Sequence, residues 1–246
     1  DLRALDGARV VSVGRIGKHL LVTCAKGREK IGVLSHLGMT GKWLRRVEGT
    51  PAPRHSRLRL HLDDDHVLHY CDQRLFGRFR LVPRARFEEV PEVAALGPDP
   101  LDAGVDVDRL LAALARTQQP VKVALMDQAL LPGVGNIQAS EALFRAAVDP
   151  RRPGKTIKRA EAARIAEGVL ASIRDTLTDF HAAHHDAGDG ADVAYVEEGA
   201  PNTFRVYDRE GEPCPRCPRG RTGRGSTIQR VVLGGRSTFF CPRCQR

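Results

Sequence analysis

Four of the six cysteines form two Cys-x-x-Cys pairs near the C-terminal end of the sequence. Cys214 and Cys217 make the first pair, and Cys241 and Cys244 make the second. Each pair can place two thiolates on one metal ion, and together the four complete the tetrahedral set typical of structural zinc. Two redox motifs are the alternative, but no thioredoxin-like strand–helix–strand pattern surrounds either pair. The spacing therefore predicts one structural Zn²⁺.

The residues around the second pair indicate the element that carries the zinc. Arg236-Ser-Thr-Phe-Phe leads into Cys241 as a strand, and residues 219–225 are a polar, glycine-rich tip, so we expect a β-hairpin. A site closed by four thiolates has no open coordination position for chemistry. We therefore expect the zinc to hold the hairpin in shape. We also expect the arginines of the hairpin to contact phosphate groups; they are Arg216, Arg236 and Arg243.

Charge and composition narrow the class of protein. The formal net charge is +9 and the pI is near 9.6, a balance that favours a polyanionic partner such as nucleic acid. A basic protein without such a partner is the alternative. No apolar run approaches the roughly 18 residues of a spanning helix, and no leader-like segment opens the chain. Four cysteines are clustered in two pairs, whereas a secreted protein with a disulfide framework rarely has this arrangement, so metal binding in a reducing compartment fits better. We expect a cytoplasmic protein with no membrane partner.

Residues 1–82 have the pattern of an antiparallel β domain. Leu58, Leu60 and Leu62 alternate with polar neighbours, the period of two that buries one face of a strand. Short strands at this spacing predict a sandwich or a barrel, of which we expect the sandwich. The expected strands are Val10–Val13, His19–Cys24, Ile31–Leu37, Leu58–Leu62, Val67–Cys71 and Phe79–Val82.

The pattern becomes helical after a linker at residues 83–105, which is rich in proline and charge. Within residues 106–203, Val107, Leu110 and Leu114 share one helix face. The expected helices cover 107–114, 121–130, 139–147 and roughly 158–179, with a glycine-rich turn at 131–136 and a flexible loop at 181–203. Residues 204–246 form the zinc hairpin, so the fold class is α+β.

Four ordered motifs resemble those of the formamidopyrimidine-DNA glycosylases. They are Ser35–Gly41, Asp72–Gly77, Leu125–Gln128 with Gly133–Glu141, and the finger from Val206 to Cys244. The resemblance runs from about Leu5 to the C-terminus. It implies an antiparallel β-sandwich followed by a helical helix-two-turn-helix domain with a C-terminal zinc β-hairpin.

The resemblance implies an activity as well as a fold. Enzymes of this family remove oxidised purines such as 8-oxoguanine and formamidopyrimidines, and cut the strand by β,δ-elimination. The implied partner is double-stranded DNA with oxidised bases or abasic sites, bound by a monomer at the nucleoid of a bacterial cell. An endonuclease VIII-type enzyme for oxidised pyrimidines and a non-catalytic zinc-finger DNA-binding protein are the alternatives.

Three residues match the family side chains that enter the DNA when the damaged nucleotide leaves the stack. Met39 and Phe76 would fill the void with apolar volume, and Arg74 would pair with the orphaned cytosine. Together they favour the purine-type enzyme. The alternative is that Met39 and Phe76 lie in the core, but glycine turns beside them indicate loop tips.

Other matches concern phosphate contact and elimination. Lys18 matches the family lysine assigned to β-elimination and phosphate contact, although a solvated surface lysine is the common alternative. Arg236 matches the arginine assigned to phosphate binding and δ-elimination. Lys122 matches a lysine near the lesion, and His55 matches a DNA contact of the β domain. Asn136 matches a phosphate-binding asparagine, with a helix N-cap as the alternative.

Two features depart from the family pattern. The family nucleophile is an N-terminal proline amine followed by a glutamate, whereas this sequence begins Asp1-Leu-Arg-Ala-Leu. We expect an incomplete chain, because the side chains for DNA contact and elimination all remain. The loop at 181–203 is divergent where the family has the flap over the flipped base, which leaves the lesion preference open.

Overall fold

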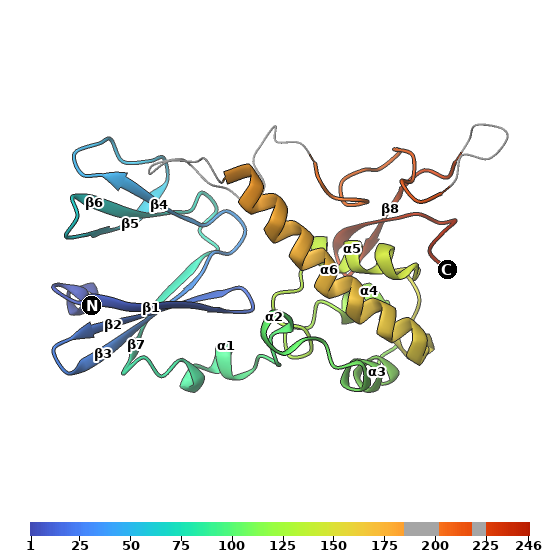
Figure 1. Cartoon of the computed structure of the whole chain (residues 1–246), viewed down its shortest axis with the longest axis horizontal. Helices are drawn as coiled ribbons and strands as arrows, with labels where there is room; N and C mark the ends of the chain where they lie inside the picture. The colour runs from blue at the N-terminus through green and yellow to red at the C-terminus, as the bar shows by residue number, and fades with distance from the viewer. Residues whose placement is uncertain (185–201, 218–224) are drawn as a thin grey trace. The chain divides into compact units, whose positions relative to one another are not determined.

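The computed structural model describes residues 1–184, 202–217 and 225–246 (Figure 1). Contacts divide the chain into two compact units. The first contains Asp1–Ala94, and the second contains Ala95–Asp179 with the described part of the C-terminal segment. Within the described residues, no helix is long and apolar enough to cross a membrane.

The first unit is an antiparallel β-sandwich, as predicted. After a short 3₁₀ helix at Leu2–Leu5, one sheet has the order β1-β2-β3-β7 and the other has the order β4-β6-β5. Their bounds are β1 Arg9–Ile16, β2 His19–Lys26, β3 Glu29–His36, β4 Lys42–Val47, β5 Ser56–His61, β6 His66–Cys71 and β7 Arg78–Pro83.

Strand β4 is the element that the sequence pattern missed. Its sequence, Lys-Trp-Leu-Arg-Arg-Val, does not alternate with a period of two. Pairing with the whole length of β6 forms the strand instead, from Lys42 opposite Cys71 to Val47 opposite His66. Trp43 on this strand also links the sheets, because its indole Nε1 donates to Ser35 Oγ at 3.1 Å.

Apolar side chains close the outer face of the first sheet. Leu34 and Val82 are buried against Val90 and Val93. The last two belong to a segment that contains a 3₁₀ helix (Phe87–Glu89) and the short helix α1 (Pro91–Ala94). The range expected as a linker therefore contains structure, and it continues into helix α2 (Pro100–Ala103).

The second unit is built from helices around one core. They are α3 Val107–Ala115, α4 Val121–Ala124, α5 Asn136–Ala146 and α6 Arg159–His184, with a 3₁₀ helix at Gly154–Thr156. Leu110, Leu125, Leu143 and Ile165 are buried in this core. Asp106 begins α3 by accepting backbone N–H bonds from Asp108 and Arg109, which is the usual N-cap role of aspartate.

Helices α4 and α6 differ most in length from the sequence prediction. Helix α4 has a single turn, because the Gln128 side chain accepts from the backbone N–H of Gly133 and donates to the backbone of Met126 and Val134. Helix α6 continues to His184, four residues into the range expected as a loop, because no glycine or proline interrupts the sequence there. The rest of that expected loop, residues 185–201, lies outside the described residues.

The C-terminal hairpin has a different tip from the predicted one. Strand β8 (Gln229–Leu233) pairs with β9 (Arg236–Phe240). The chain turns at Gly234 and Gly235, both with positive φ, as two-residue hairpin turns require. Residues 219–225 are therefore not the turn between these strands, and most of them lie outside the described part of the chain.

Candidate functional site

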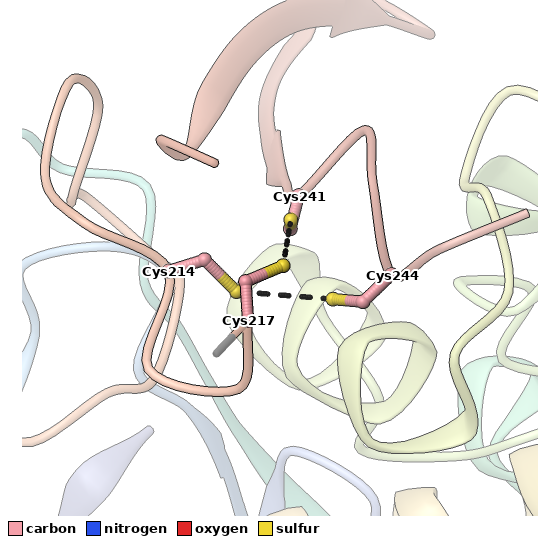
Figure 2. A group of neighbouring side chains, drawn as sticks. All are labelled: Cys214, Cys217, Cys241 and Cys244. Carbon is pink, nitrogen blue, oxygen red and sulfur yellow. Dashed lines mark hydrogen bonds between the residues drawn. The ribbon is translucent and has the colours of Figure 1, made fainter. Parts of the chain in front are cut away.

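The four predicted cysteines converge on one point (Figure 2). Their sulfur atoms all lie within 4.8 Å of one another. Cys214 Sγ is 3.8 Å from Cys244 Sγ, and Cys217 Sγ is 3.5 Å from Cys241 Sγ. A zinc–sulfur bond of about 2.3 Å in tetrahedral geometry separates the sulfur atoms by about 3.8 Å. The cluster fits one structural zinc ion.

The surroundings of the cluster prepare Cys241 to be a thiolate. Burial works against ionisation, but hydrogen bonds from the Ser226 side chain and the backbone of Cys244 and Arg243 outweigh it and lower the pKa of Cys241 to about 6. Burial and the neighbouring sulfurs raise the pKa of Cys217 to about 11. A metal cation in the centre stabilises all four thiolates together.

The turn that carries the second cysteine pair, residues 241–244, is attached to the helical core. Gln245 is buried; its Oε1 accepts the Cys241 backbone N–H at 2.8 Å, and its Nε2 donates to the Val148 carbonyl at 2.9 Å. Arg216 stacks on Phe144, 4.7 Å from the ring centroid, and donates to the Arg145 carbonyl. Arg216, expected to suit phosphate, therefore has partners within the protein.

Glu141 joins the finger to helix α5. This buried carboxylate accepts three backbone N–H bonds, from Arg205 at 3.1 Å, Val206 at 2.8 Å and Tyr207 at 3.1 Å. It also pairs with Arg145 at 2.7 Å. Sequence reasoning gave Glu141 no role of its own. The available signal was a glutamate with an arginine four residues later on a helix of small and apolar residues.

Three predicted residues meet at the start of α5. Lys122 Nζ donates to Asn136 Oδ1 at 2.5 Å, and Asn136 Nδ2 donates to the Ser237 carbonyl of β9 at 2.9 Å. Lys122 is fully buried, and burial, helped by the positive charge of Arg236, lowers its pKa to about 8. Arg236 itself is exposed. The N-cap residue is Gly135, so the Asn136 side chain makes tertiary contacts rather than capping α5.

Two loops of the first unit are held together by Asp72. This buried carboxylate accepts from Thr40 Oγ1 at 2.6 Å and from the backbone N–H of Arg74 at 3.2 Å and Gly77 at 2.8 Å. Burial alone would raise its pKa, but these hydrogen bonds hold the pKa of Asp72 below its ordinary value. The ionised side chain therefore locks the loop 37–41 to the loop 72–77. No role was assigned to Asp72 from sequence.

The two loops present three exposed side chains. Met39 is 66% exposed and Phe76 is 55% exposed, which excludes the core as their location. The Arg74 guanidinium lies 4.9 Å from the centroid of the Phe76 ring. A Cβ on Gly38 would lie 2.7 Å from the Phe76 carbonyl carbon, so the backbones of the two loops are in contact. The structure thus brings Met39, Arg74 and Phe76 to one place.

The remaining predicted residues of this unit lie in exposed turns. His55 has a φ of +60°, and its carbonyl accepts the Asp72 backbone N–H at 3.1 Å, which connects its turn to the Asp72 loops. Lys18 is exposed in the turn between β1 and β2. Their roles stay predictions.

The sequence of this protein matches known families over most of its length. The formamidopyrimidine-DNA glycosylase N-terminal domain matches residues 2–79, and the H2TH domain of the same glycosylase matches residues 96–183. The zinc finger found in FPG and IleRS matches residues 225–246. A Laribacter hongkongensis formamidopyrimidine-DNA glycosylase is 40% identical, and the match covers 100% of this chain and 86% of that relative. The chain belongs to the formamidopyrimidine-DNA glycosylase family.

Solved structures of formamidopyrimidine-DNA glycosylases have the same fold. The Thermus thermophilus MutM (Fpg) protein is 36% identical, with a TM-score of 0.73 over 97% of this chain and 84% of that one. Lactococcus lactis Fpg in complex with DNA containing an abasic site is 25% identical, with a TM-score of 0.80 over 98% of this chain and 83% of that one. A MutM structure with carbocyclic 8-oxo-G-containing DNA also has a TM-score of 0.80.

Proposed function

We propose that this protein is a base-excision DNA glycosylase that removes oxidised purines and then cuts the strand at the abasic site. The observation that carries the proposal is the exposed set Met39, Arg74 and Phe76, fixed on two loops by one buried carboxylate. We further propose that it acts as a monomer on DNA in the bacterial cytoplasm, at the nucleoid. The positive net charge of +9 supports a DNA partner.

The exposed set suits a duplex from which one nucleotide has been extruded. A damaged nucleotide must leave the stack before an amine can reach its sugar, and the base opposite is then unpaired. Met39 and Phe76 supply apolar volume for the gap. Arg74 supplies guanidinium donors, which match the acceptor atoms on the Watson–Crick edge of an orphaned cytosine. Asp72 holds both loops in place in the protein without DNA, so binding does not lose further conformational entropy by ordering them.

The start of α5 suits the phosphates of DNA. Helix N-termini attract anions, and Asn136 and the exposed Arg236 lie beside this one. Lys122 is fully buried and donates to Asn136, so we propose that it acts on the DNA through Asn136. His55 and Lys18 would contact phosphate from the first unit.

Strand cutting follows from the covalent intermediate. An amine that attacks C1′ displaces the base and forms an iminium, which acidifies the proton on C2′. Loss of that proton expels the 3′ phosphate, and a second elimination expels the 5′ phosphate. We propose that Lys18 assists the first elimination and Arg236 the second.

We propose that the attacking amine is the proline amine of a Pro-Glu start, as the family resemblance implies. Lys122 is the buried amine that could compete, because its pKa is lowered to about 8. However, it is fully buried and its Nζ donates to Asn136, so it cannot reach a sugar without leaving that site. Lys18 is the exposed competitor.

The test is excision and trapping on defined duplexes. Two proteins are compared: residues 1–246, and the same chain with a helix that starts Pro-Glu joined ahead of Asp1. Each is incubated with duplexes containing 8-oxoguanine opposite cytosine, thymine glycol, or an abasic site. We expect the extended protein to excise 8-oxoguanine, to leave a gap with phosphate at both ends, and to give a borohydride-trapped adduct at proline. Preference for thymine glycol would contradict the purine assignment. An adduct at Lys18 or Lys122 would contradict the nucleophile.

The buried Asp72 provides a prediction about lesion recognition. In Asp72→Asn, the amide nitrogen replaces one acceptor oxygen, so a bond to Thr40, Arg74 or Gly77 is replaced by two donors facing each other. We expect the free energy of unfolding to fall by about 1–3 kcal/mol. Affinity for an abasic-site duplex should fall about tenfold relative to undamaged duplex, measured by fluorescence anisotropy. The exposed Asp63→Asn is the control. An unchanged preference in Asp72→Asn would show that the loops do not read the lesion.

The phosphate site gives a prediction about salt. Arg236→Ala and Asn136→Ala should weaken binding to damaged and undamaged duplex alike, because phosphate contacts carry no sequence information. For Arg236→Ala, the slope of log affinity against log salt should become shallower by about one, since one cationic contact is lost. Titrations at several salt concentrations measure this slope. Loss of lesion preference with undamaged-duplex affinity intact would contradict both roles.

A further inference from the structure

His36 makes a specific hydrogen bond beside the Met39 loop. It is the last residue of β3, and its Nδ1 accepts the backbone N–H of Gly38 at 3.1 Å. Acceptance at Nδ1 requires the neutral ring with its proton on Nε2. Gly38 directly precedes Met39, so this bond fixes the backbone from which Met39 projects.

Gly38 is also the point at which the two loops touch. Its φ is +67°, and a Cβ there would lie 2.7 Å from the Phe76 carbonyl carbon and 2.8 Å from the Gly77 nitrogen. A change in the orientation of Gly38 therefore disturbs the contact with the second loop as well as the position of Met39. The His36 ring thus binds Gly38 at this contact, and Asp72 binds the backbone N–H of Gly77 in the second loop.

Burial and the neighbouring cationic groups favour the neutral form of His36. Its ring centroid lies 4.9 Å from that of His19, its register partner on β2, and its register partner on β7 is Arg78. Burial, then His19, Lys18 and Arg78, lower the pKa of His36 below its ordinary value. Burial also lowers the pKa of His19, although Glu92 of α1 opposes this. Two rings this close do not both take a proton readily.

We propose that His36 is a positioning residue for Met39 and that its protonation releases the Met39 loop. The inference rests on the proposed function, in which Met39 enters the damaged duplex. A proton on Nδ1 turns the acceptor into a donor that faces the Gly38 N–H, so the bond is lost. Because the neutral form makes the bond and its pKa is lowered, the bond is intact at neutral pH. It is lost only as the pH falls below the ordinary histidine range near 6.5.

Two substitutions separate the hydrogen bond from the ring. In His36→Asn, Oδ1 occupies the place of Nδ1 and accepts from Gly38, but it does not titrate in this range. In His36→Gln, the polar atoms lie further out, at the place of Nε2. Entry of side chains into the duplex is followed between pH 5 and 8 by the fluorescence of 2-aminopurine opposite a tetrahydrofuran abasic analogue. Anisotropy with undamaged duplex measures general binding.

We expect the wild-type signal to weaken at acid pH, the His36→Asn signal to be strong and independent of pH, and the His36→Gln signal to be weak throughout. The preference of His36→Gln for abasic over undamaged duplex should fall about three- to tenfold. When the wild-type protein gives a 2-aminopurine response, equal behaviour of the two variants, or a wild-type signal independent of pH, overturns the inference.

A second measurement keeps the test independent of the proposed function and of variant folding. Nitrogen-15 NMR of the wild-type protein without DNA shows which ring nitrogen of His36 carries the proton. The Nε2–H tautomer at neutral pH, with a Gly38 amide shift that changes as His36 titrates, supports the inference. An Nδ1–H tautomer contradicts it. Absence of a 2-aminopurine response at every pH, with duplex binding and the Nε2–H tautomer intact, contradicts the proposed entry of Met39 and not the hydrogen bond.

Discussion

Removal of zinc is expected to unfold the C-terminal finger and to abolish DNA binding. Cys214, Cys217 and Cys241 are themselves buried in the cluster that includes Phe144 and Phe239, so the thiolates form part of the core of the finger. Without the cation, Cys217 is a protonated thiol at neutral pH, because its pKa is raised to about 11, and nothing links the four sulfur atoms at the centre of the finger. Binding of structural zinc to small fingers supplies about 10–16 kcal/mol at neutral pH.

The experiment measures zinc content and DNA affinity together. The double variant Cys214→Ser, Cys241→Ser should contain less than a tenth of the wild-type zinc and should lose measurable affinity for undamaged duplex. The matched control is Cys24→Ala, because Cys24 is a buried cysteine of strand β2 outside the cluster. The control should keep one zinc ion per chain. Full zinc content in the double variant would refute the four-sulfur assignment.

Replacement of Glu141 by glutamine is expected to destabilise the second unit by about 3–5 kcal/mol, the usual loss when one partner of a buried ion pair is removed. Oε1 accepts from Val206 and Tyr207, while Oε2 accepts from Arg205 and Arg145. Glutamine keeps one oxygen and places an amide N–H donor where the other oxygen was. That donor faces existing N–H groups, and Arg145 loses a charged partner in α5.

Hydrogen exchange and denaturation can test this prediction residue by residue. The amides of Val206 and Tyr207 should lose most of their protection in Glu141→Gln, and the transition of the second unit should move to lower denaturant concentration. Glu167→Gln is the control: Glu167 is exposed on α6, where a change of charge shifts stability by about 0.5 kcal/mol or less. Retained protection at Val206 would show that Glu141 does not hold the finger.

Local patterns predicted the parts of the fold whose cause is local. The Cys-x-x-Cys spacing predicted the metal centre, and short apolar runs, one of them alternating, predicted six of the seven strands that the described residues of the first unit contain. Strand β4 was missed because only its partner β6 makes it a strand. Helix α4 was predicted too long because a side chain, Gln128, takes the place of backbone partners in the next turn.

The site was predicted less completely than the fold. Met39, Arg74 and Phe76 were proposed from the family resemblance, because apolar side chains exposed on loops leave no periodic pattern in the sequence. Asp72 and Glu141 were missed as organisers. Their hydrogen-bond partners come from turns and from chain segments up to 66 residues away. Local sequence patterns do not predict which buried carboxylate will bind such distant N–H groups.

The bond between Asn136 and Ser237 joins positions 101 residues apart. During translation the β domain and the helices leave the ribosome first and can fold as they emerge. The Asn136 side chain, however, cannot donate to the Ser237 carbonyl until β9 has been made. The turn at residues 241–244 is attached to the helical core only after Gln245 has been made and donates to the Val148 carbonyl. A nascent chain therefore completes the proposed phosphate site only at the end of synthesis. Polypeptides released early from the ribosome would bind DNA weakly rather than occupy damage that they cannot repair.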